Sequence, residues 1–347
     1  KDEFNATVEG NFTVVLTDIA YEPSQPNHTV DLNASVNLEM IWVEPGTFTM
    51  GSPTSEANRA TDETEHNVTL TKGFYLGKYE VTQAQYEAVM AGNSNSLSAT
   101  PSQYSGNPNR PVEKVSWDDA QVFLTRLNAA EQTAGRLPAG WSYVLPTESQ
   151  WEYACRAGTT TVYSWGNAIT SANANYYISG INLTTVVGQY AANPWGFFDM
   201  HGNVYEWTAD WYSSTYPTGN PGIDPTGPAS GSSRVFRGGS WAYAGPVLRS
   251  AKRLSNSPGT RNYYLGFRVG FQKVQPDTAA PELSLLGGAS VTHQAGTPWA
   301  EPGVSALDVR DGNLTSRVSV SGLVDVNTTG LYVLTYTVSD TAGNFAT

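Results

Sequence analysis

The chain has 347 residues, a formal net charge of −12 and only 14% charged residues. This length suffices for two or three domains, and the acidic balance argues against the basic surface that nucleic-acid backbones require. No stretch approaches the ~20 apolar residues of a membrane helix. The single cysteine, Cys155, excludes an internal disulfide and a thiolate metal cluster. Its apolar neighbours at helical spacing predict a buried core residue.

The first 37 residues predict a β segment followed by a linker. Residues 12–19, Phe-Thr-Val-Val-Leu-Thr-Asp-Ile, have the composition and the loose alternation of a strand. Pro23 and Pro26 then lead into a polar stretch. At Met40 the pattern becomes strand, Pro-Gly turn and strand, so we expect a central domain over residues 38–273.

Three helix starts follow, each marked by a hydroxyl residue with an amide or carboxyl side chain three positions later. This is the pattern of a capping box. The hydroxyl accepts a hydrogen bond from the backbone N–H three residues later, and the later side chain accepts from the backbone N–H of the hydroxyl residue. The pairs are Thr82 with Gln85, Ser116 with Asp119, and Thr147 with Gln150. Residues 163–236 show little periodicity and many Gly, Asn, Pro and Trp residues, which predicts a long-loop region organised by aromatic rings.

Residues 195–210 read WGFFDMHGNVYEWTAD, and the motifs Arg237-Gly-Gly-Ser-Trp and Leu265-Gly-Phe-Arg-Val-Gly-Phe follow. Together they resemble the signature of the formylglycine-generating enzyme (sulfatase-modifying factor) family, whose fold is a variant of the C-type lectin fold. The resemblance implies a copper-binding cysteine pair just after the Gly-Gly-Ser. Here Tyr243 and Leu248 stand near those positions and residues 241–248 contain no cysteine. We therefore expect neither copper nor the oxidase activity of the family, since copper(I) needs soft thiolate ligands.

The resemblance also implies a calcium site in the same loop. Its ligands would be the side chains of Asp199 and Glu206 and the backbone carbonyls of Gly202 and Val204, and such hard oxygens suit calcium. The alternative is that Glu206 only accepts hydrogen bonds from loop amides and that no metal binds. A second family calcium site would begin at Asn175 and the Tyr176 carbonyl. Its acidic member falls around residues 179–181, which contain no carboxylate, and this argues against that site.

In ligand-binding relatives of this fold, the segment between the Gly-Gly-Ser-Trp and Leu-Gly-Phe-Arg motifs displays side chains on the binding face. Tyrosine and arginine are favoured at recognition surfaces, and the segment offers Tyr243, Arg249, Arg253, Tyr263 and Tyr264. For the two arginines, the alternative is that they form internal ion pairs that hold the loops. We expect Tyr263 and Tyr264 to be exposed.

After Pro276 the chain is strand-like, and its closing Thr-Ala-Gly-Asn resembles bacterial immunoglobulin-like repeats of surface proteins. We expect residues 274–347 to form a β-sandwich that lacks its last strand. Asp308, Asp311 and Asn313 form either a calcium site or a plain acidic turn.

The predicted architecture is α+β, with a lectin-like central domain and an all-β sandwich. The sequence opens at Lys1 without an apolar leader, so we expect a processed, secreted or cell-surface bacterial protein. It would be non-catalytic and would bind a glycan or a protein. One hypothesis is head-to-tail self-assembly, in which residues 12–19 fill the open sandwich of a neighbouring copy. The enzymatic alternative is a metal-dependent enzyme of altered chemistry, or a hydrolase using Asp118, Asp119, Asp210 or His201, although their spacing selects no acid and base.

Overall fold

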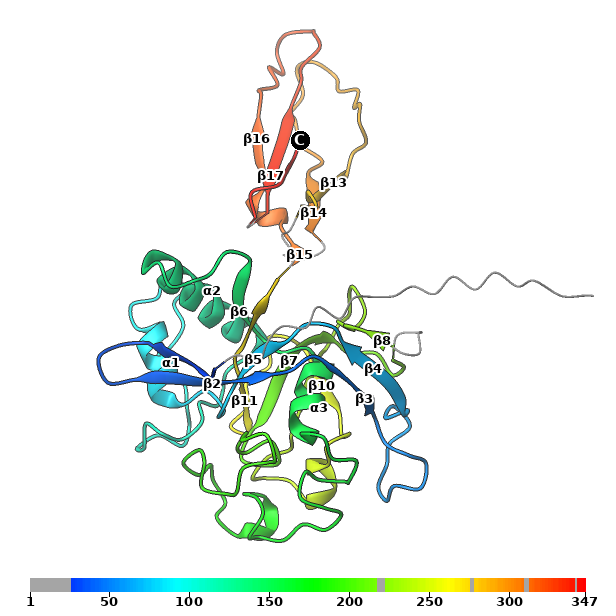
Figure 1. Ribbon diagram of the computed structural model, residues 1–347. Coiled ribbons are helices and arrows are strands. Elements are labelled where there is room, and N and C mark those ends of the chain that lie inside the picture. Colours follow the sequence, from blue (N-terminus) through cyan, green and yellow to red (C-terminus); the bar gives the residue numbers. More distant parts are fainter. Residues whose placement is uncertain (1–25, 217–221, 275–277, 309–311, 341) are drawn as a thin grey trace, which may run out of the picture. The chain divides into compact units, whose positions relative to one another are not determined.

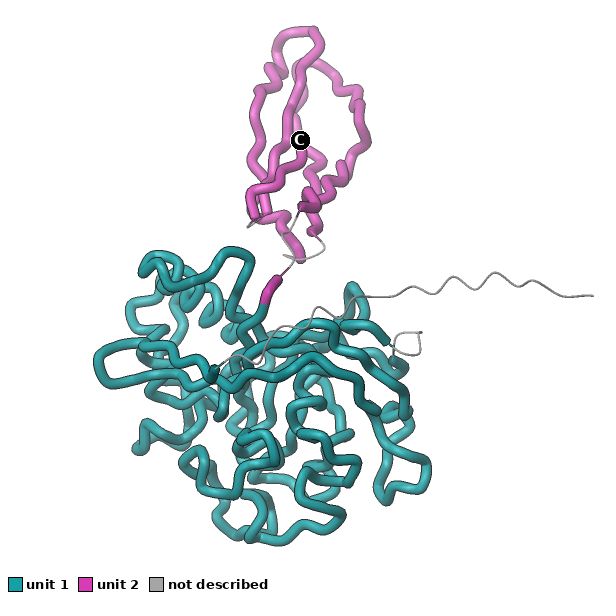
Figure 2. Tube along the Cα trace, viewed as in Figure 1, with its two compact units in different colours: residues 1–272 teal, residues 273–347 magenta. Residues whose placement is uncertain are grey.

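The computed structural model describes residues 26–216, 222–274, 278–308, 312–340 and 342–347. The chain divides into two compact units, residues 1–272 and 273–347, coloured separately in Figure 2. Residues 12–19, the expected N-terminal strand, lie outside the described residues. Within the described part of the chain, no helix combines the length and the apolar character needed to span a membrane.

The largest sheet of the first unit joins the two ends of that unit (Figure 1). Its strand order is β1-β2-β5-β12-β6, with the bounds β1 His28–Asp31, β2 Asn37–Val43, β5 Phe74–Gly77, β12 Gly270–Lys273 and β6 Trp141–Val144. Strand β1 pairs antiparallel with β2, His28 standing opposite Met40. The sheet therefore begins before Leu38, the expected start of the central domain, and that boundary is corrected to include β1.

Two smaller sheets complete the β-structure of this unit. One has the order β10-β9-β7-β11, formed by β10 Leu254–Asn256, β9 Arg234–Arg237, β7 Tyr205–Trp211 and β11 Leu265–Phe267. The other has the order β3-β4-β8, formed by β3 Gly46–Met50, β4 His66–Leu70 and β8 Gly222–Ile223. Strand β7 contains the end of the 195–210 motif and β11 begins the Leu-Gly-Phe-Arg motif. These two motifs are neighbours in space, because β7 and β11 pair in parallel with Glu206 opposite Gly266.

The described residues form three helices, α1 Gln83–Met90, α2 Trp117–Thr133 and α3 Glu148–Arg156; α2 and α3 pack against these sheets, and α1 packs against α2. Each starts at the predicted capping box, with both reciprocal hydrogen bonds formed. The inward stripe of α2 includes Phe123, Leu124 and Leu127, which lie in the main core. Local sequence thus fixes the helix starts, and burial of the apolar stripe fixes the helix orientation.

Most of residues 157–204 is irregular and carries only the short helical turn η1 Tyr177–Ser179. A second turn, η2 Gly245–Leu248, follows the Gly-Gly-Ser-Trp motif. Buried rings organise these loops: Tyr163 and Tyr176 form a small core together with Leu248. This is the loop-rich, aromatic organisation that the composition predicts, and the α+β class is confirmed.

The second unit is a β-structure with a small core. Its described strands form two three-stranded arrays, β13-β14-β15 and β16-β17-β18, with the bounds β13 Glu282–Leu285, β14 Val304–Asp308, β15 Gly312–Asn313, β16 Ser319–Ser321, β17 Thr335–Ser339 and β18 Phe345–Ala346 and the turn η3 Thr315–Arg317. Only Ala306, Leu314 and Val338 form its buried apolar cluster. Asp308 is buried, whereas Asp311 lies outside the described residues.

Candidate functional site

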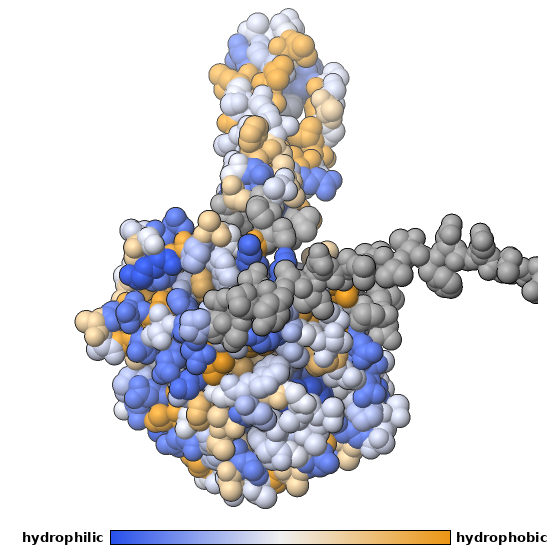
Figure 3. All heavy atoms as spheres, viewed as in Figure 1, coloured by the Kyte–Doolittle hydropathy of each residue, from blue (hydrophilic) through white to orange (hydrophobic). Residues whose placement is uncertain are grey.

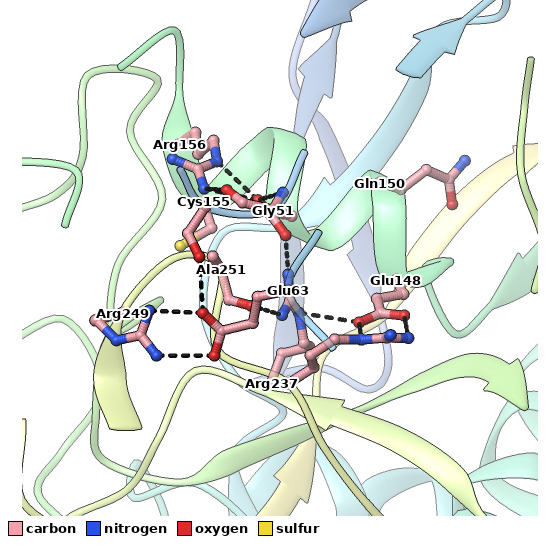
Figure 4. A network of polar contacts seen from close by, with 12 residues as sticks. Gly51, Glu63, Glu148, Gln150, Cys155, Arg156, Arg237, Arg249 and Ala251 are labelled. Carbon is pink, nitrogen blue, oxygen red and sulfur yellow. Dashed lines mark hydrogen bonds and ion pairs between the residues drawn. The ribbon is translucent and has the colours of Figure 1, made fainter. Parts of the chain in front are cut away.

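Helix α3 anchors the loops of the candidate site through its acidic residues (Figure 4). Glu152 accepts a hydrogen bond from the Gly51 amide at 2.9 Å and pairs with Arg156 and Arg237. Arg237, the first residue of the Gly-Gly-Ser-Trp motif, is fully buried and also donates to the Ala251 carbonyl at 2.8 Å. Arg237 therefore ties the motif to α3, and the two glycines that follow it adopt positive φ values.

Arg249 and Arg253 belong to this internal network. Arg249 donates to both oxygens of Glu63, at 2.7 and 2.8 Å, and Arg253 donates to both oxygens of Glu148, at 2.8 and 2.6 Å. Only 1% of Arg249 and 3% of Arg253 is exposed. The expectation that these two side chains contribute to a ligand-binding face is corrected: they form the internal ion pairs that were its alternative.

The predicted calcium loop is tightly turned. Asp199 and Asn203 adopt φ values of +58° and +59°, and Gly202 adopts +102°, so three residues of this loop lie in the left-handed region. Asp199 is buried, and one of its oxygens accepts a hydrogen bond from the Gly188 amide at 2.6 Å. Burial raises the pKa of Asp199 to about 6, against this hydrogen bond and the positive charge of Arg268.

Glu206 is fully engaged within the protein. Its two oxygens accept from Nη2 and Nε of Arg268 at 2.8 and 3.0 Å, and one also accepts from the indole N–H of Trp151 at 2.7 Å. The alternative stated for Glu206, acceptance of hydrogen bonds from loop amides, is therefore not what the structure shows. The donors are two side chains from distant parts of the sequence.

Sequence reasoning missed a third carboxyl group beside this loop. Glu80 accepts from the Val204 amide at 3.0 Å and from the Asn203 side chain at 2.7 Å. Burial, followed by the negative charges of Asp199 and Glu206, raises its pKa well above the usual value. Three buried carboxyl groups, those of Glu80, Asp199 and Glu206, thus surround the single guanidinium of Arg268.

The residues of the second expected calcium site make hydrogen bonds of their own. The Ser179 hydroxyl lies within hydrogen-bond distance of Asn175 Oδ1, at 3.0 Å, and of the Tyr176 carbonyl, at 2.6 Å. Their hydrogen-bond partners among the described residues are Leu183, Asn203 and Ser179, and none of these three carries a carboxylate. Across the described ranges, no three or more His, Cys, Asp or Glu side chains are grouped so that they could hold a metal ion.

The positions that would carry the copper ligands are filled by packing residues. Leu248 is fully buried, and its side chain packs against the backbone turns at Gly202 and Gly239. Its carbonyl accepts from the Nδ1–H of His201 at 2.7 Å, which leaves Nε2 to accept from the Ser164 amide at 3.2 Å. No thiolate can form here, and the space is already occupied.

Cys155 lies near this position, with its sulfur 3.5 Å from His201 Nε2. A cysteine beside a histidine is the arrangement of many thiol nucleophiles. Here, however, the cysteine is fully buried, and burial raises the pKa of the thiol to about 12. Because only the thiolate is nucleophilic, this pair is inert packing, and the prediction of a buried core cysteine is confirmed.

Five aromatic side chains form a connected surface cluster, which we call the aromatic face. Its members are Tyr104, Trp241, Tyr243, Tyr263 and Tyr264. The ring centroids of Trp241 and Tyr263 lie 5.7 Å apart, and Tyr104 meets Trp241 edge-on at 5.3 Å. Tyr263 is 38% exposed, whereas Tyr243 and Tyr264 are half-buried. Tyr263 is therefore exposed, as expected, whereas Tyr264 is only partly exposed.

Two members of the aromatic face were not predicted as ligand residues. Trp241 is visible in the Gly-Gly-Ser-Trp motif, but Tyr104 comes from a distant proline-rich loop and carries no motif. The face continues towards Tyr177 and Ile178, which are 62% and 63% exposed. The Tyr177 amide donates to the Tyr243 carbonyl at 3.0 Å, which joins this loop to the face.

The acids and the histidine considered for a hydrolase have separate partners. Asp119 pairs with Arg261, Asp210 accepts from the Glu148 amide, and His201 bonds to Leu248 and Ser164. Asp210 does line a cavity of about 260 Å³, together with Glu148 and Arg253. His66 also lines this cavity, but its Nδ1 lies 2.9 Å from the Thr64 carbonyl.

Comparison with known proteins agrees with this geometry. Residues 27–272 match the model of the sulfatase-modifying factor enzyme 1-like domain. The chain belongs to this family. Residues 283–347 match the bacterial surface protein Ig-like domain, so a second domain typical of bacterial surface proteins follows.

The curated relatives include a formylglycine-generating enzyme and a serine/threonine-protein kinase. The formylglycine-generating enzyme of Streptomyces coelicolor is 36% identical over 185 residues, which are 48% of this chain and 54% of that protein. The serine/threonine-protein kinase pkn1 of Chlamydia caviae is 32% identical over 255 residues, 66% of this chain and 37% of that protein. The chain thus spans about half the length of the first and little more than a third of the second.

Two solved structures share the fold of the first unit. Treponema denticola variable protein 1 aligns with a TM-score of 0.60 and 27% identity, over 71% of this chain and 99% of that chain. PvdO from Pseudomonas aeruginosa aligns with a TM-score of 0.63 and 26% identity, over 72% of this chain and 100% of that chain. The predicted resemblance and fold are confirmed.

Proposed function

We propose that this protein is a non-catalytic binding protein of the bacterial cell surface or surroundings, and that the aromatic face of its first unit contacts the ligand. The observation that carries this proposal is the replacement of the family's thiolate pair. Leu248 is buried where a copper ligand would stand, and Tyr243 packs into the aromatic face. Near the positions of the family's cysteine pair, this chain therefore has a buried leucine and an aromatic surface in place of thiolates.

The ligand would be a glycan or a protein, because both suit an aromatic surface. Ring faces and edges stack against the C–H groups of sugars or against side chains, and tyrosine gives a large contact area at low entropic cost. Tyr263 and Trp241 supply the outer part of this area. The Ig-like unit, which matches a domain of bacterial surface proteins, supports a role outside the cell.

A glycan array and a panel of extracellular proteins, probed with the full chain, test this function. Tyr263→Ala and Trp241→Ala should each weaken binding at least tenfold, a typical loss for a central aromatic contact. Ile223→Ala is the matched control, since Ile223 is 49% exposed on β8 and is not part of the aromatic face. Binding that survives both aromatic substitutions would rule out this face.

The same preparation tests the enzymatic alternative. Incubation with copper and a cysteine-containing sulfatase peptide should leave the peptide cysteine unchanged by mass spectrometry. A converted peptide would overturn the non-catalytic assignment. It would also require a copper ligand set that the described residues do not provide.

We further propose that calcium binds beside Arg268, in the loop that contains Asp199 and Glu206. Calcium binding would require all three carboxyl groups to be ionised, although burial raises the pKa of Glu80 and of Asp199; Glu80, Asp199 and Glu206 would then carry −3 against +1 on Arg268. One divalent cation would balance the remaining −2. The Gly202 and Val204 carbonyls and the Asp199 carboxylate are oxygen ligands of the kind that calcium prefers.

A second candidate function is self-assembly through the Ig-like unit. Of the fifteen exposed large hydrophobic residues in the described part of the chain, nine lie in this unit, at positions 285, 286, 291, 307, 320, 323, 331, 333 and 345. The unit spans only residues 273–347, so apolar exposure is concentrated in a small part of the chain. Concentrated apolar exposure is a mark of interaction surfaces.

A further inference from the structure

The Ig-like unit contains a large cavity between two of its irregular segments. The cavity measures about 480 Å³, and its walls come from residues 285–303 and 324–336. Polar residues such as His293, Asp325 and Thr328 contribute to its walls, and six large apolar or aromatic side chains line the rest: Leu285, Val291, Trp299, Leu331, Val333 and Tyr336. We call this the apolar cavity. Figure 3 shows apolar side chains gathered on the unit that contains it.

The apolar cavity is open rather than closed by packing. Leu331 is 94% exposed and Val333 is 68% exposed, although both line the cavity. A backbone hydrogen bond crosses between its walls, from the Gly296 amide to the Val326 carbonyl at 2.7 Å. Exposed apolar side chains gathered along a groove mark interaction surfaces, so this open cavity has the character of an acceptor site.

We propose that the apolar cavity accepts residues 12–19 of a second copy of the chain as an added β-strand. This inference rests on the self-assembly candidate above and names its partner segment. Strand addition provides main-chain hydrogen bonds and pockets for alternate side chains. In an extended segment, Phe12, Val14 and Leu16 share one face, because side chains alternate with a period of two.

The chemistry of the segment suits an apolar receptor. Residues 12–17 read Phe-Thr-Val-Val-Leu-Thr and carry no charge, so no ion has to leave water when they are buried. β-Branched and aromatic residues, which favour strands, make up five of these six positions. A strand of six residues spans ~20 Å, which is a typical strand length for a small sheet.

Donor and acceptor lie in different parts of the chain, so the contact joins unlike surfaces. Each molecule would donate residues 12–19 to one neighbour and accept the same segment from another. Such a head-to-tail contact builds a ring if its rotation closes and a filament if it does not. The assembly should therefore grow with concentration beyond a dimer.

Light scattering coupled to size-exclusion chromatography of the full chain tests the proposal. The mass of the wild type should rise with concentration, whereas the donor variant Leu16→Asp and the acceptor variant Leu331→Asp should each remain monomeric. Ile223→Asp is the matched control, since Ile223 is a 49% exposed aliphatic residue of the first unit that does not line the apolar cavity. It should assemble like the wild type.

Mixing the two inactive variants identifies the occupant. Leu331→Asp retains an intact donor and Leu16→Asp retains an intact acceptor, so an equimolar mixture should form a dimer that grows no further. A mixture that stays monomeric would overturn exchange of residues 12–19 between copies. Assembly of Leu16→Asp at wild-type levels would overturn residues 12–19 as the occupant.

Two further outcomes complete the test. A wild type that remains monomeric at every concentration, with an unaltered elution volume for Leu331→Asp, would overturn the proposal as a whole. Circular dichroism of each variant checks that loss of assembly is not loss of folding. Tyr263→Ala should assemble normally, so failure of the ligand-binding function and failure of strand exchange are distinguishable.

Discussion

Arg268 holds Glu206 through a two-point ion pair inside the core of the first unit, and neither side chain is exposed. The same guanidinium donates to the carbonyls of Gly77 and Phe198, both at 2.8 Å. One side chain thus links the Leu-Gly-Phe-Arg motif to β7, to the end of β5 and to the predicted calcium loop.

Replacing this arginine should strongly destabilise the fold. Arg268→Met leaves the Glu206 carboxylate buried and unpaired, so we expect the free energy of unfolding to fall by about 3–5 kcal/mol. Chemical denaturation of the full chain measures it. Lys78→Met breaks the exposed pair with Glu39 and should cost no more than about 1 kcal/mol. Equal losses in the two variants would contradict the role of Arg268.

Calcium removal should lower thermal stability. An ion bound by the folded state alone stabilises it in proportion to the logarithm of its concentration over its dissociation constant. We expect the melting temperature of the wild type to fall by about 5 °C or more in chelator. In Asp199→Ala the two melting curves should coincide, and magnesium should not restore the loss. Identical curves for the wild type with and without chelator would refute the calcium site.

Asp210 should make the protein less stable as the pH rises. Burial and the Glu148 carboxylate raise its pKa to about 7, against the Glu148 amide hydrogen bond and the charges of Arg253 and Arg234. The folded protein therefore keeps a proton that the unfolded chain releases near pH 4, and this stability is lost between about pH 4 and pH 7.

Asp210→Asn removes this titration and keeps an oxygen that can accept from the Glu148 amide. The variant should be more stable than the wild type at pH 8, by on the order of 1–3 kcal/mol, and close to it at pH 4. Denaturant titrations at the two pH values give the difference. Other titrating groups cancel in this comparison, so equal pH slopes for the two proteins would exclude the raised pKa.

Cys155 should resist modification in the folded state. Because its thiol is buried and its pKa is raised, a thiol-specific chromogenic reagent should label it only after unfolding in guanidinium. Ser257→Cys, at an exposed position, provides a second thiol that should react at once. Rapid labelling of the native wild type would show that the Cys155–His201 pair is accessible.

Local patterns were sufficient to predict the helices and the family motifs. The capping boxes at Thr82, Ser116 and Thr147 lie within three residues of their partners, so the sequence contains the whole interaction. The expectation that copper does not bind likewise depends only on which residues follow Gly-Gly-Ser, and it stays a prediction. These predictions need no knowledge of the tertiary fold.

The contents of the site depend on residues that are far apart in sequence. Glu80 reaches Val204 across 124 residues, and Arg249 reaches Glu63 across 186. No periodicity or spacing rule joins such positions, which is why the Glu80 carboxyl was missed and the two arginines were considered for the surface. Tyr104 joined the aromatic face for the same reason.

The buried arginines hold the backbone of this site, whereas the rings of the aromatic face lie at the surface. This separation determines which side chains can be substituted. Residues 237–253 are fixed from beneath by Arg237, Arg249 and Arg253, while the rings of Trp241 and Tyr263 make none of those ion pairs. Outer side chains can therefore be exchanged without disturbing the scaffold. A library randomised at Trp241 and Tyr263, the outer positions of the aromatic face, should therefore leave the fold unaltered, whereas Tyr243 and Tyr264 also pack against the main core.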